Sequence, residues 1–346
     1  MKTNTNIFTY FLSRTLFLGG GISMMFLYSN KDSYIACILG TLLGIGILYL
    51  FSYFQKKISP SLNHCLRENN ILNIIFKIIY ILYLLFTTFI ILIILSTFIH
   101  SYFLPFTPTI MSCLPFIFLA FYLNGKKIKN IYYIAFILFI LSILTIITKT
   151  LLLTNELKVS NIFPIMMTST SNLFKSSGIY CILSTAPFLI NLGNKTTFKE
   201  SLKYYLIAAF ANLIVILTII FILGEMVSIY SYPEYAILRK ISFFQFVENI
   251  ENFISVSWFF DLFISLSLIS VQIKETLNLQ KNIISFILSI LILLLTNKIV
   301  ANNFYNSIAI YKVFPFILLG FIIILFLLLF FKTKKSSSTN ETINKK

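Results

Sequence analysis

Runs of about 20 apolar residues follow one another along the whole chain, and this feature constrains the fold more than any other. Each run is long enough to cross a hydrocarbon core of roughly 30 Å as an α-helix. With 58% hydrophobic and 11% charged residues, the chain has little polar surface with which to cover such runs in water. We therefore expect an all-α membrane protein. Its ten expected spans lie at about 7–28, 33–54, 72–99, 108–123, 131–153, 173–192, 204–227, 250–272, 282–300 and 308–331.

The chain has a net charge of +16, and most of its lysines fall in short segments between the expected spans. When the loops and the adjoining span ends are counted, 17 Lys and Arg residues lie on the side of the N-terminus and eight on the opposite side, which predicts that both termini are cytoplasmic. An even number of spans also requires that both termini lie on the same side of the membrane. Basic loops of this kind orient a protein in a bilayer. We therefore expect the protein to lie in the lipid bilayer of a bacterial cell (inner) membrane, with these charges in loops at the membrane surface. We expect no nucleic-acid partner.

Three consecutive glycines, Gly19, Gly20 and Gly21, stand in the middle of the first apolar run. Each glycine costs roughly 1 kcal/mol relative to alanine in a helix, and in lipid any freed backbone group needs another partner. A helix that is interrupted here would present N–H groups and a half-helix N-terminus, both of which favour a bound carboxylate. The triplet and the following Ile22 are thus candidate ligand-binding residues. Close packing of two helix backbones is the alternative explanation.

The sixth expected span carries a similar set of small and helix-breaking residues. We expect its middle to be unwound between Ser177-Gly178 and Ser184-Thr185, just before Pro187. The hydroxyl groups and freed carbonyls would then meet a substrate amine or a cation, although packing around a proline kink explains the same residues. Interrupted helices at corresponding positions of two halves are typical of secondary transporters. They predict a five-plus-five inverted repeat with halves at about 7–153 and 173–331.

Three charged residues within or near the spans are candidates for a coupling or structural role. Asp261 lies in the eighth span, Arg14 precedes the glycines, and Lys149 lies near the end of the fifth span. A charge near the bilayer centre costs about 2.5–3.5 kcal/mol on insertion scales, so such residues usually face the interior and pair. We expect Asp261 to be a proton or cation site, or else to pair with a lysine from a loop. The side chain of Arg14 either joins the site or extends toward the membrane surface.

The segments outside the spans are short, with three exceptions. Two long connections, 154–172 and 228–249, lie on the outer side in the expected orientation. The second has apolar residues at near-helical spacing between Tyr235 and Val247, which predicts a short amphipathic helix over the outer mouth or packed on the bundle. The basic, Ser-rich segment 332–346 has almost nothing to bury, so we expect a disordered cytoplasmic tail.

No motif in the sequence indicates catalysis. The four cysteines show no CxxC spacing, the two histidines lie at opposite span ends, and no nucleophile–base pair or phosphate-binding loop is present. We therefore expect neither an enzyme nor a metal site, and we expect no cofactor.

Several stretches of the chain resemble the B-subunit permease family of spore germinant receptors. The first is the segment Tyr232-Pro233…Arg239…Ile241…Phe244…Val247-Glu248…Ile250…Phe253…Trp258 after the seventh span. The others are Asn161-Ile162-Phe163-Pro164, which resembles the start of the family's sixth helix, and Asp32 at the start of the second. The resemblance implies the inverted-repeat fold of the amino acid–polyamine–organocation superfamily, in which helices one and six bind an amino acid or a related solute. It also implies other germinant-receptor subunits as partners.

Three functions follow from these observations. The first is an amino-acid permease-like protein of the spore germination family that binds a small zwitterion at the bilayer midplane and works by alternating access. The second is a receptor subunit on the same fold that senses a germinant and transports little of it. The third is a divergent solute transporter unrelated to germination. A membrane enzyme acting on a lipid-linked sugar would need a wide cavity lined with several charges, and few charges lie within these spans.

Overall fold

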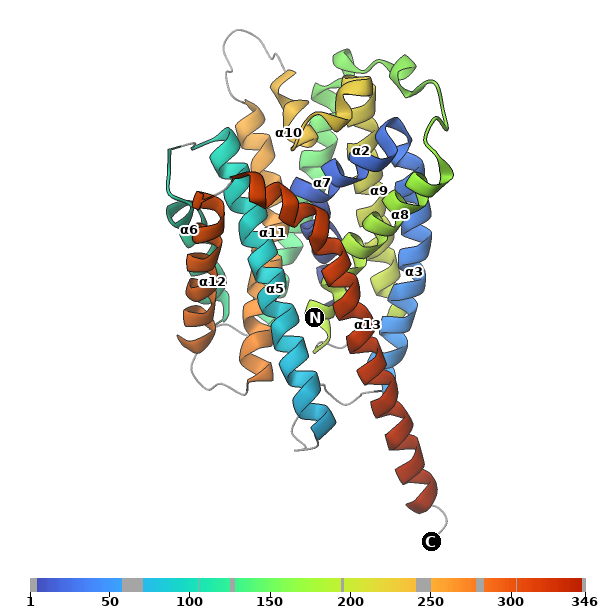
Figure 1. Ribbon diagram of the computed structural model, residues 1–346, viewed down its shortest axis with the longest axis vertical. Helices are drawn as coiled ribbons and strands as arrows, with labels where there is room; N and C mark the ends of the chain where they lie inside the picture. Colours follow the sequence, from blue (N-terminus) through green and yellow to red (C-terminus); the bar gives the residue numbers. More distant parts are fainter. Residues whose placement is uncertain are drawn as a thin grey trace.

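The computed structural model describes residues 5–57, 71–104, 106–124, 128–193, 196–240, 250–277, 283–302 and 304–343. In these ranges all regular secondary structure is helical, and most of the longer helices run along the long axis of the molecule (Figure 1). The main helices are α1 (Phe8–Thr15), α2 (Ile22–Ser29), α3 (Ser33–Lys57), α5 (Ile71–Tyr102), α6 (Thr109–Asn124), α7 (Ile128–Leu152), α8 (Thr170–Thr185), α9 (Phe198–Leu223), α10 (Pro233–Ala236), α11 (Ile250–Thr276), α12 (Ile283–Asn302) and α13 (Phe304–Ile343).

Seven stretches of the described chain are long and apolar enough to cross a membrane. They are Thr5–Gln55, Ile71–Tyr102, Asn130–Leu152, Thr170–Asn191, Phe198–Ser228, Ser257–Thr276 and Lys312–Phe331, and two shorter apolar helices span Ile110–Ala120 and Ser289–Lys298. The first stretch contains two of the expected spans, 7–28 and 33–54. Between them the backbone turns at Asn30, which has a φ of 40° and a ψ of −123°.

The first of these stretches is interrupted at the glycine triplet, as the sequence predicted. Helix α1 ends at Thr15 and α2 begins at Ile22, and the wide turn η2 (Phe17–Gly21) lies between them. Leu18 is extended, with φ −69° and ψ 148°, and Gly19 has a positive φ of 80°. Extended and left-handed residues cannot continue an α-helix, so backbone groups near Leu18 and Gly19 are freed for other partners.

The sixth expected span does not unwind where we predicted. Helix α8 runs without a break from Thr170 through Gly178 to Thr185, and the chain then tightens into a 3₁₀ segment, η6 (Ala186–Asn191). A single glycine costs a helix only about 1 kcal/mol, which the packing of neighbouring helices readily offsets. Pro187 stands in the first turn of η6, where a missing N–H removes no helical hydrogen bond.

Two tyrosine side chains of helix α5 bind the carbonyl groups of η6. The hydroxyl of Tyr83 donates to the carbonyl of Ala186 at 2.7 Å, and that of Tyr80 donates to the carbonyl of Leu189 at 3.0 Å. These bonds give hydrogen-bond donors to carbonyl groups at the end of the helix, where the regular α-helical N–H partners are missing. The end of α8 is therefore held by α5 and not by solvent.

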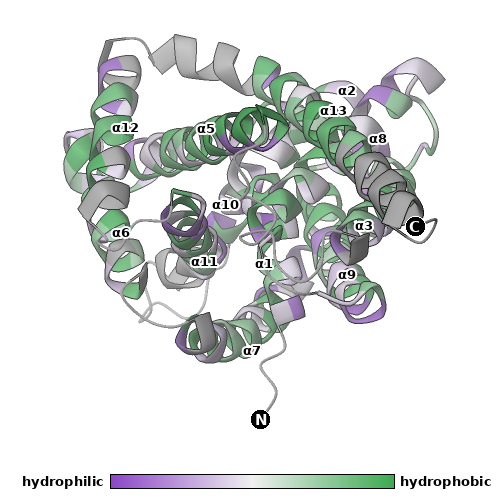
Figure 2. Ribbon diagram, turned by 90° about the horizontal axis from the view of Figure 1, so that it is seen from below, coloured by the Kyte–Doolittle hydropathy of each residue, from purple (hydrophilic) through white to green (hydrophobic). Residues whose placement is uncertain are grey.

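Helix α1 lies near the middle of the bundle when the molecule is seen from below (Figure 2). All eight of its residues are buried, and it packs against α7, α8, α9 and α11. By contrast, large apolar side chains such as Leu42 on α3, Ile78 on α5 and Leu151 on α7 are exposed on the outside. A buried centre with an apolar exterior suits a protein whose surroundings are lipid.

Two segments outside the expected spans are the C-terminal segment 332–346 and the predicted amphipathic stretch after Tyr235. We expected 332–346 to be disordered, but α13 continues as a helix to Ile343. Extending an existing helix is far easier than starting one, and Lys, Ser and Thr tolerate helical geometry. In the predicted amphipathic stretch, α10 is followed by the short turn η8 (Leu238–Lys240), and the remainder, 241–249, lies outside the described residues.

Candidate functional site

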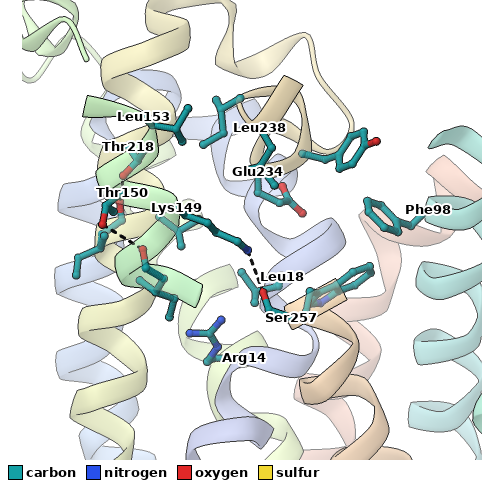
Figure 3. A pocket seen from close by; sticks show the side chains of 16 residues that line it. Arg14, Leu18, Phe98, Lys149, Thr150, Leu153, Thr218, Glu234, Leu238 and Ser257 are labelled. Carbon is teal, nitrogen blue, oxygen red and sulfur yellow. Dashed lines mark hydrogen bonds between the residues drawn. The ribbon is translucent and has the colours of Figure 1, made fainter. Parts of the chain in front are cut away.

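A pocket lies next to the interruption of the first helix, at the end of the bundle that holds α10 (Figure 3). It has about 690 Å³ of empty space, including the part that is open to the outside. Its walls come from α1 and η2, α5, α7, α9, α10 with η8, and α11. Apolar side chains such as Leu18, Phe98 and Trp258 form most of the surface. The charged or hydroxyl-bearing residues, other than Tyr235, are Arg14, Lys149, Thr150, Thr218, Glu234 and Ser257.

The backbone amide freed at Gly19 is bound by a carboxylate of the protein itself. The Gly19 N–H donates to Oε1 of Glu234 at 2.8 Å. Glycine is required at this position for two reasons. Its φ of 80° is rarely adopted by other residues, and a Cβ here would come within 2.9 Å of Cε2 of Trp258. The interruption, the indole ring and the glutamate therefore form one packed unit.

Glu234 reaches this position from the connection between the seventh and eighth expected spans. It follows Pro233, which starts the four-residue helix α10, and its side chain points into the pocket (Figure 3). Burial raises the pKa of the Glu234 carboxyl to about 7, because a charge is costly away from water. The Gly19 N–H and the nearby Lys149 ammonium favour the ionised form and lower this pKa, but their effect is smaller than that of burial.

Lys149 lines the pocket from α7. Its Nζ donates to the hydroxyl of Ser257, at the start of the apolar part of α11, at 3.0 Å. The amine thus connects two helices across the pocket and supplies a positive charge close to Glu234. As part of this wall it can pair with an anionic group that enters the pocket.

Arg14 and Asp261 form a buried ion pair beneath the pocket. Nε of Arg14 lies 3.2 Å from Oδ2 of Asp261, and the two side chains are 4% and 0% exposed. Arg14 also donates to the hydroxyl of Tyr10 at 2.9 Å, and that hydroxyl lies 2.8 Å from Oγ of Ser142. Arg14 therefore does not extend to the membrane surface, and Asp261 pairs with it and not with a loop lysine. Removing either partner would leave a buried charge uncompensated.

The structure gathers only some of the predicted site residues at this pocket. Arg14 and Lys149 line it, Gly19 holds Glu234 at its edge, and Asp261 lies behind Arg14. Gly21 instead packs toward α8, where a Cβ would lie 2.6 Å from Cδ1 of Leu183. Gly20 and Ile22 are buried beside it, and the carbonyl of Gly20 accepts from the hydroxyl of Ser23 at 2.8 Å.

The predicted residues of the sixth span lie on α8 and do not line this pocket. Their hydroxyls bond to carbonyls of their own helix: Ser177 to Phe174 at 2.9 Å, and Thr185 to Cys181 at 2.7 Å. Ser184 donates to the same Cys181 carbonyl at 3.2 Å, and beside Gly178 there is open space within 4 Å. Their role in ligand binding stays a prediction. No group of three or more His, Cys, Asp or Glu residues in the described ranges could hold a metal ion.

Sequence reasoning missed Glu234 as a site residue. The sequence showed Tyr232-Pro233-Glu234 only as the end of a span, and Glu234 is separated from Gly19 by 215 positions. A local pattern cannot reveal a pairing at that distance along the chain. The available signal was compositional: an acidic residue directly after a proline is unusual in a chain with so few acidic residues.

A comparison with protein-family models gives a match to the family described as spore germination protein (spore permease), over residues 7–304. The chain belongs to the spore germination protein family. The matched range includes every residue that lines the pocket. A search of curated proteins found no match. Together with the apolar helices, membership of this family makes the chain a multi-pass, permease-like membrane protein related to germination.

Proposed function

We propose that this spore germination family member binds a small amino acid, or a related zwitterion, in the pocket beside Leu18 and Gly19. The observation that carries the proposal is the interrupted first helix, which opens on a pocket containing both signs of charge. The carboxylate of a zwitterion needs a cationic partner, which Lys149 offers, and its amine needs oxygen acceptors, which the hydroxyl groups of Thr150 and Thr218 in the pocket wall offer. The apolar remainder of the wall suits a small side chain.

For the architecture, we propose one ten-span domain over residues 1–331, built as two inverted halves at about 7–153 and 173–331. Three observations support it: the stretch Thr5–Gln55 contains two expected spans, α6 and α12 supply shorter apolar helices, and the first helix is interrupted. The excess of Lys and Arg on one side supports cytoplasmic termini in a bacterial cell membrane.

Two modes of action are compatible with such a pocket. In a permease the solute crosses by alternating access. In a germinant-sensing subunit, occupancy of the pocket changes contacts with other germinant-receptor subunits and little solute crosses. Membership of the spore germination family favours sensing, while the permease-like character of that family favours transport. A divergent transporter unrelated to germination is the alternative that family membership disfavours.

Binding and flux measured on the same purified protein test the proposal. Each of the twenty L-amino acids, radiolabelled, is assayed by equilibrium binding in detergent and by counterflow in proteoliposomes. We expect at least one to bind and Lys149→Gln to weaken that binding about tenfold or more, since a hydrogen bond to a charged group is worth about 1.5–3 kcal/mol. Lys158→Gln, at an exposed lysine outside the pocket, is the matched control.

Flux together with binding supports a permease, and binding without flux supports a sensor. Absence of binding for every amino acid, or unchanged affinity in Lys149→Gln, would contradict the proposed site.

A further inference from the structure

The carboxylate of Glu234 stands where the carboxylate of a ligand is expected. The interruption at Leu18 and Gly19 frees a backbone N–H at the pocket wall, and Oε1 of Glu234 accepts from it at 2.8 Å. The Lys149 ammonium is close enough to stabilise the charge of the same carboxylate. A backbone N–H and a lysine together are the usual recognition elements for a carboxylate. Here the protein supplies that carboxylate itself.

Glu234 is also tethered to a segment that covers the pocket. Helix α10 and turn η8 lie over the pocket in the view of Figure 3, and both contribute residues to its lining. Helix α5 holds this segment in place: the hydroxyl of Tyr232 lies 2.6 Å from Oγ1 of Thr97, and the ring of Tyr235 lies 4.4 Å from that of Tyr102. Glu234 is thus the point at which a covering segment touches the interrupted helix.

We propose that Glu234 is a tethered competitor: its carboxylate binds the Gly19 amide in the ligand-free protein, and a ligand must carry a free carboxylate to displace it. This inference rests on the proposed function. One N–H cannot serve two carboxylates at full strength, and two like charges in a poorly hydrated pocket repel each other. Displacement of Glu234 then removes the contact between the segment 228–240 and the interrupted helix, which links pocket occupancy to the exposed end of the bundle.

Competition with Glu234 selects ligands that carry a carboxylate. Amino acids and other small carboxylates would displace Glu234, whereas the corresponding amides and amines, which lack the carboxylate, would not. The competing group also loses charge near neutral pH, because burial raises the pKa of Glu234 to about 7. The charged and titratable groups near it are Lys149 from α7 and Tyr102 from α5, and Arg14 from α1 and Tyr235 from α10 line the same pocket.

Variants of Glu234 test the competition directly. The affinities of the twenty L-amino acids and of their amides are measured for wild type, Glu234→Gln and Glu234→Ala. A binding-competent state that is only partly populated lowers the apparent affinity by its population, so removing the competitor strengthens binding of the amino acids. We expect a gain of about tenfold for Glu234→Ala, with the amides bound weakly by every form.

Two internal comparisons sharpen the experiment. Glu225→Gln makes the same change at an exposed glutamate that pairs with Lys31, and its affinity should equal that of wild type. Wild-type affinity should rise as the pH falls from 8 to 6, because protonated Glu234 competes less well, while the affinity of Glu234→Gln should stay level.

A measurement without ligand tests whether Glu234 protects the Gly19 amide in the ligand-free protein. Hydrogen exchange at the Gly19 amide and over 228–240 should be faster in Glu234→Ala than in wild type or Glu225→Gln. Unchanged exchange, or amino-acid affinity that stays level or falls in both Glu234→Gln and Glu234→Ala, would overturn the inference and leave the proposed function standing. Absence of binding in wild type and all variants would overturn both.

Discussion

At Gly19 the backbone adopts a conformation that other residues rarely take, and the space for a side chain is already filled. Gly178, in contrast, lies in a regular helix beside open space within 4 Å. We expect Gly19→Ala to destabilise the protein by about 2–4 kcal/mol, from left-handed strain and from overlap with the Trp258 ring. Unfolding in detergent micelles measures the loss. Gly178→Ala is the matched control and should lie within about 1 kcal/mol of wild type; equal effects of the two changes would contradict this role for Gly19.

The ion pair between Arg14 and Asp261 is buried, and its loss should be costly. Asp261→Asn keeps the shape of the side chain but leaves the buried Arg14 without its counter-charge, so we expect a loss of about 3–5 kcal/mol in the free energy of unfolding. The double variant Arg14→Met with Asp261→Leu should recover part of that loss. Glu225→Gln, which breaks an exposed pair with Lys31, should cost no more than about 1 kcal/mol. A loss in Asp261→Asn as small as that of Glu225→Gln would refute the importance of the buried pair.

Among the helices, α3 and α8 form a close pair, and two glycines of α3, Gly40 and Gly44, come close to atoms of α8. A Cβ at Gly40 would lie 2.6 Å from the carbonyl oxygen of Ser177, whereas one at Gly46, six residues further on, would meet nothing within 4 Å. Small residues at such spacings allow helix backbones to approach closely in lipid.

We therefore expect Gly40→Ala to push α3 away from α8 and to cost about 1–3 kcal/mol, while Gly46→Ala leaves stability nearly unchanged or slightly raised. Thermal melting of the two variants in the same detergent compares them directly. Similar melting temperatures would show that the close approach contributes little.

The interrupted first helix and the continuous α8 show which features the sequence could predict and which it could not. The interruption at Gly19 was predictable because three glycines in an apolar run act locally on the helix that contains them. The continuous α8 was not, because the fate of Gly178 and Pro187 depends on packing and on donors such as Tyr83 from another helix. Arg14, Lys149 and Asp261 were recognised one by one from their cost in a membrane. That Glu234 would reach Gly19 depends on the tertiary fold and leaves no local pattern.

For the molecule as a whole, the orientation in the membrane is open to a labelling test. In a Cys65→Ser background the other cysteines, Cys37, Cys113 and Cys181, are buried. A membrane-impermeant maleimide added to intact cells should label Lys158→Cys, and it should label Ser337→Cys only after permeabilisation. This pattern follows from the excess of positive charge on the side of both termini. The reverse pattern would place the pocket mouth and α10 on the cytoplasmic side.

The pocket lies at the end of the bundle that holds α10, and in the proposed orientation that end faces outward. The interrupted helix, the ion pair beneath it and the covering segment would then act together: the interruption presents an amide, Arg14 and Asp261 hold α1 to α11, and Glu234 blocks the amide until a solute arrives. The first helix is central to this account because each of these contacts includes one of its residues or the turn that follows it.

A structure of the protein with its best-binding amino acid, determined by cryo-electron microscopy, tests that central point most directly. The account predicts the ligand carboxylate within hydrogen-bonding distance of the Gly19 N–H and near Nζ of Lys149, with the side chain of Glu234 turned away. A ligand bound elsewhere, with Glu234 still on the Gly19 amide, or an unbroken helix through Gly19, would contradict it.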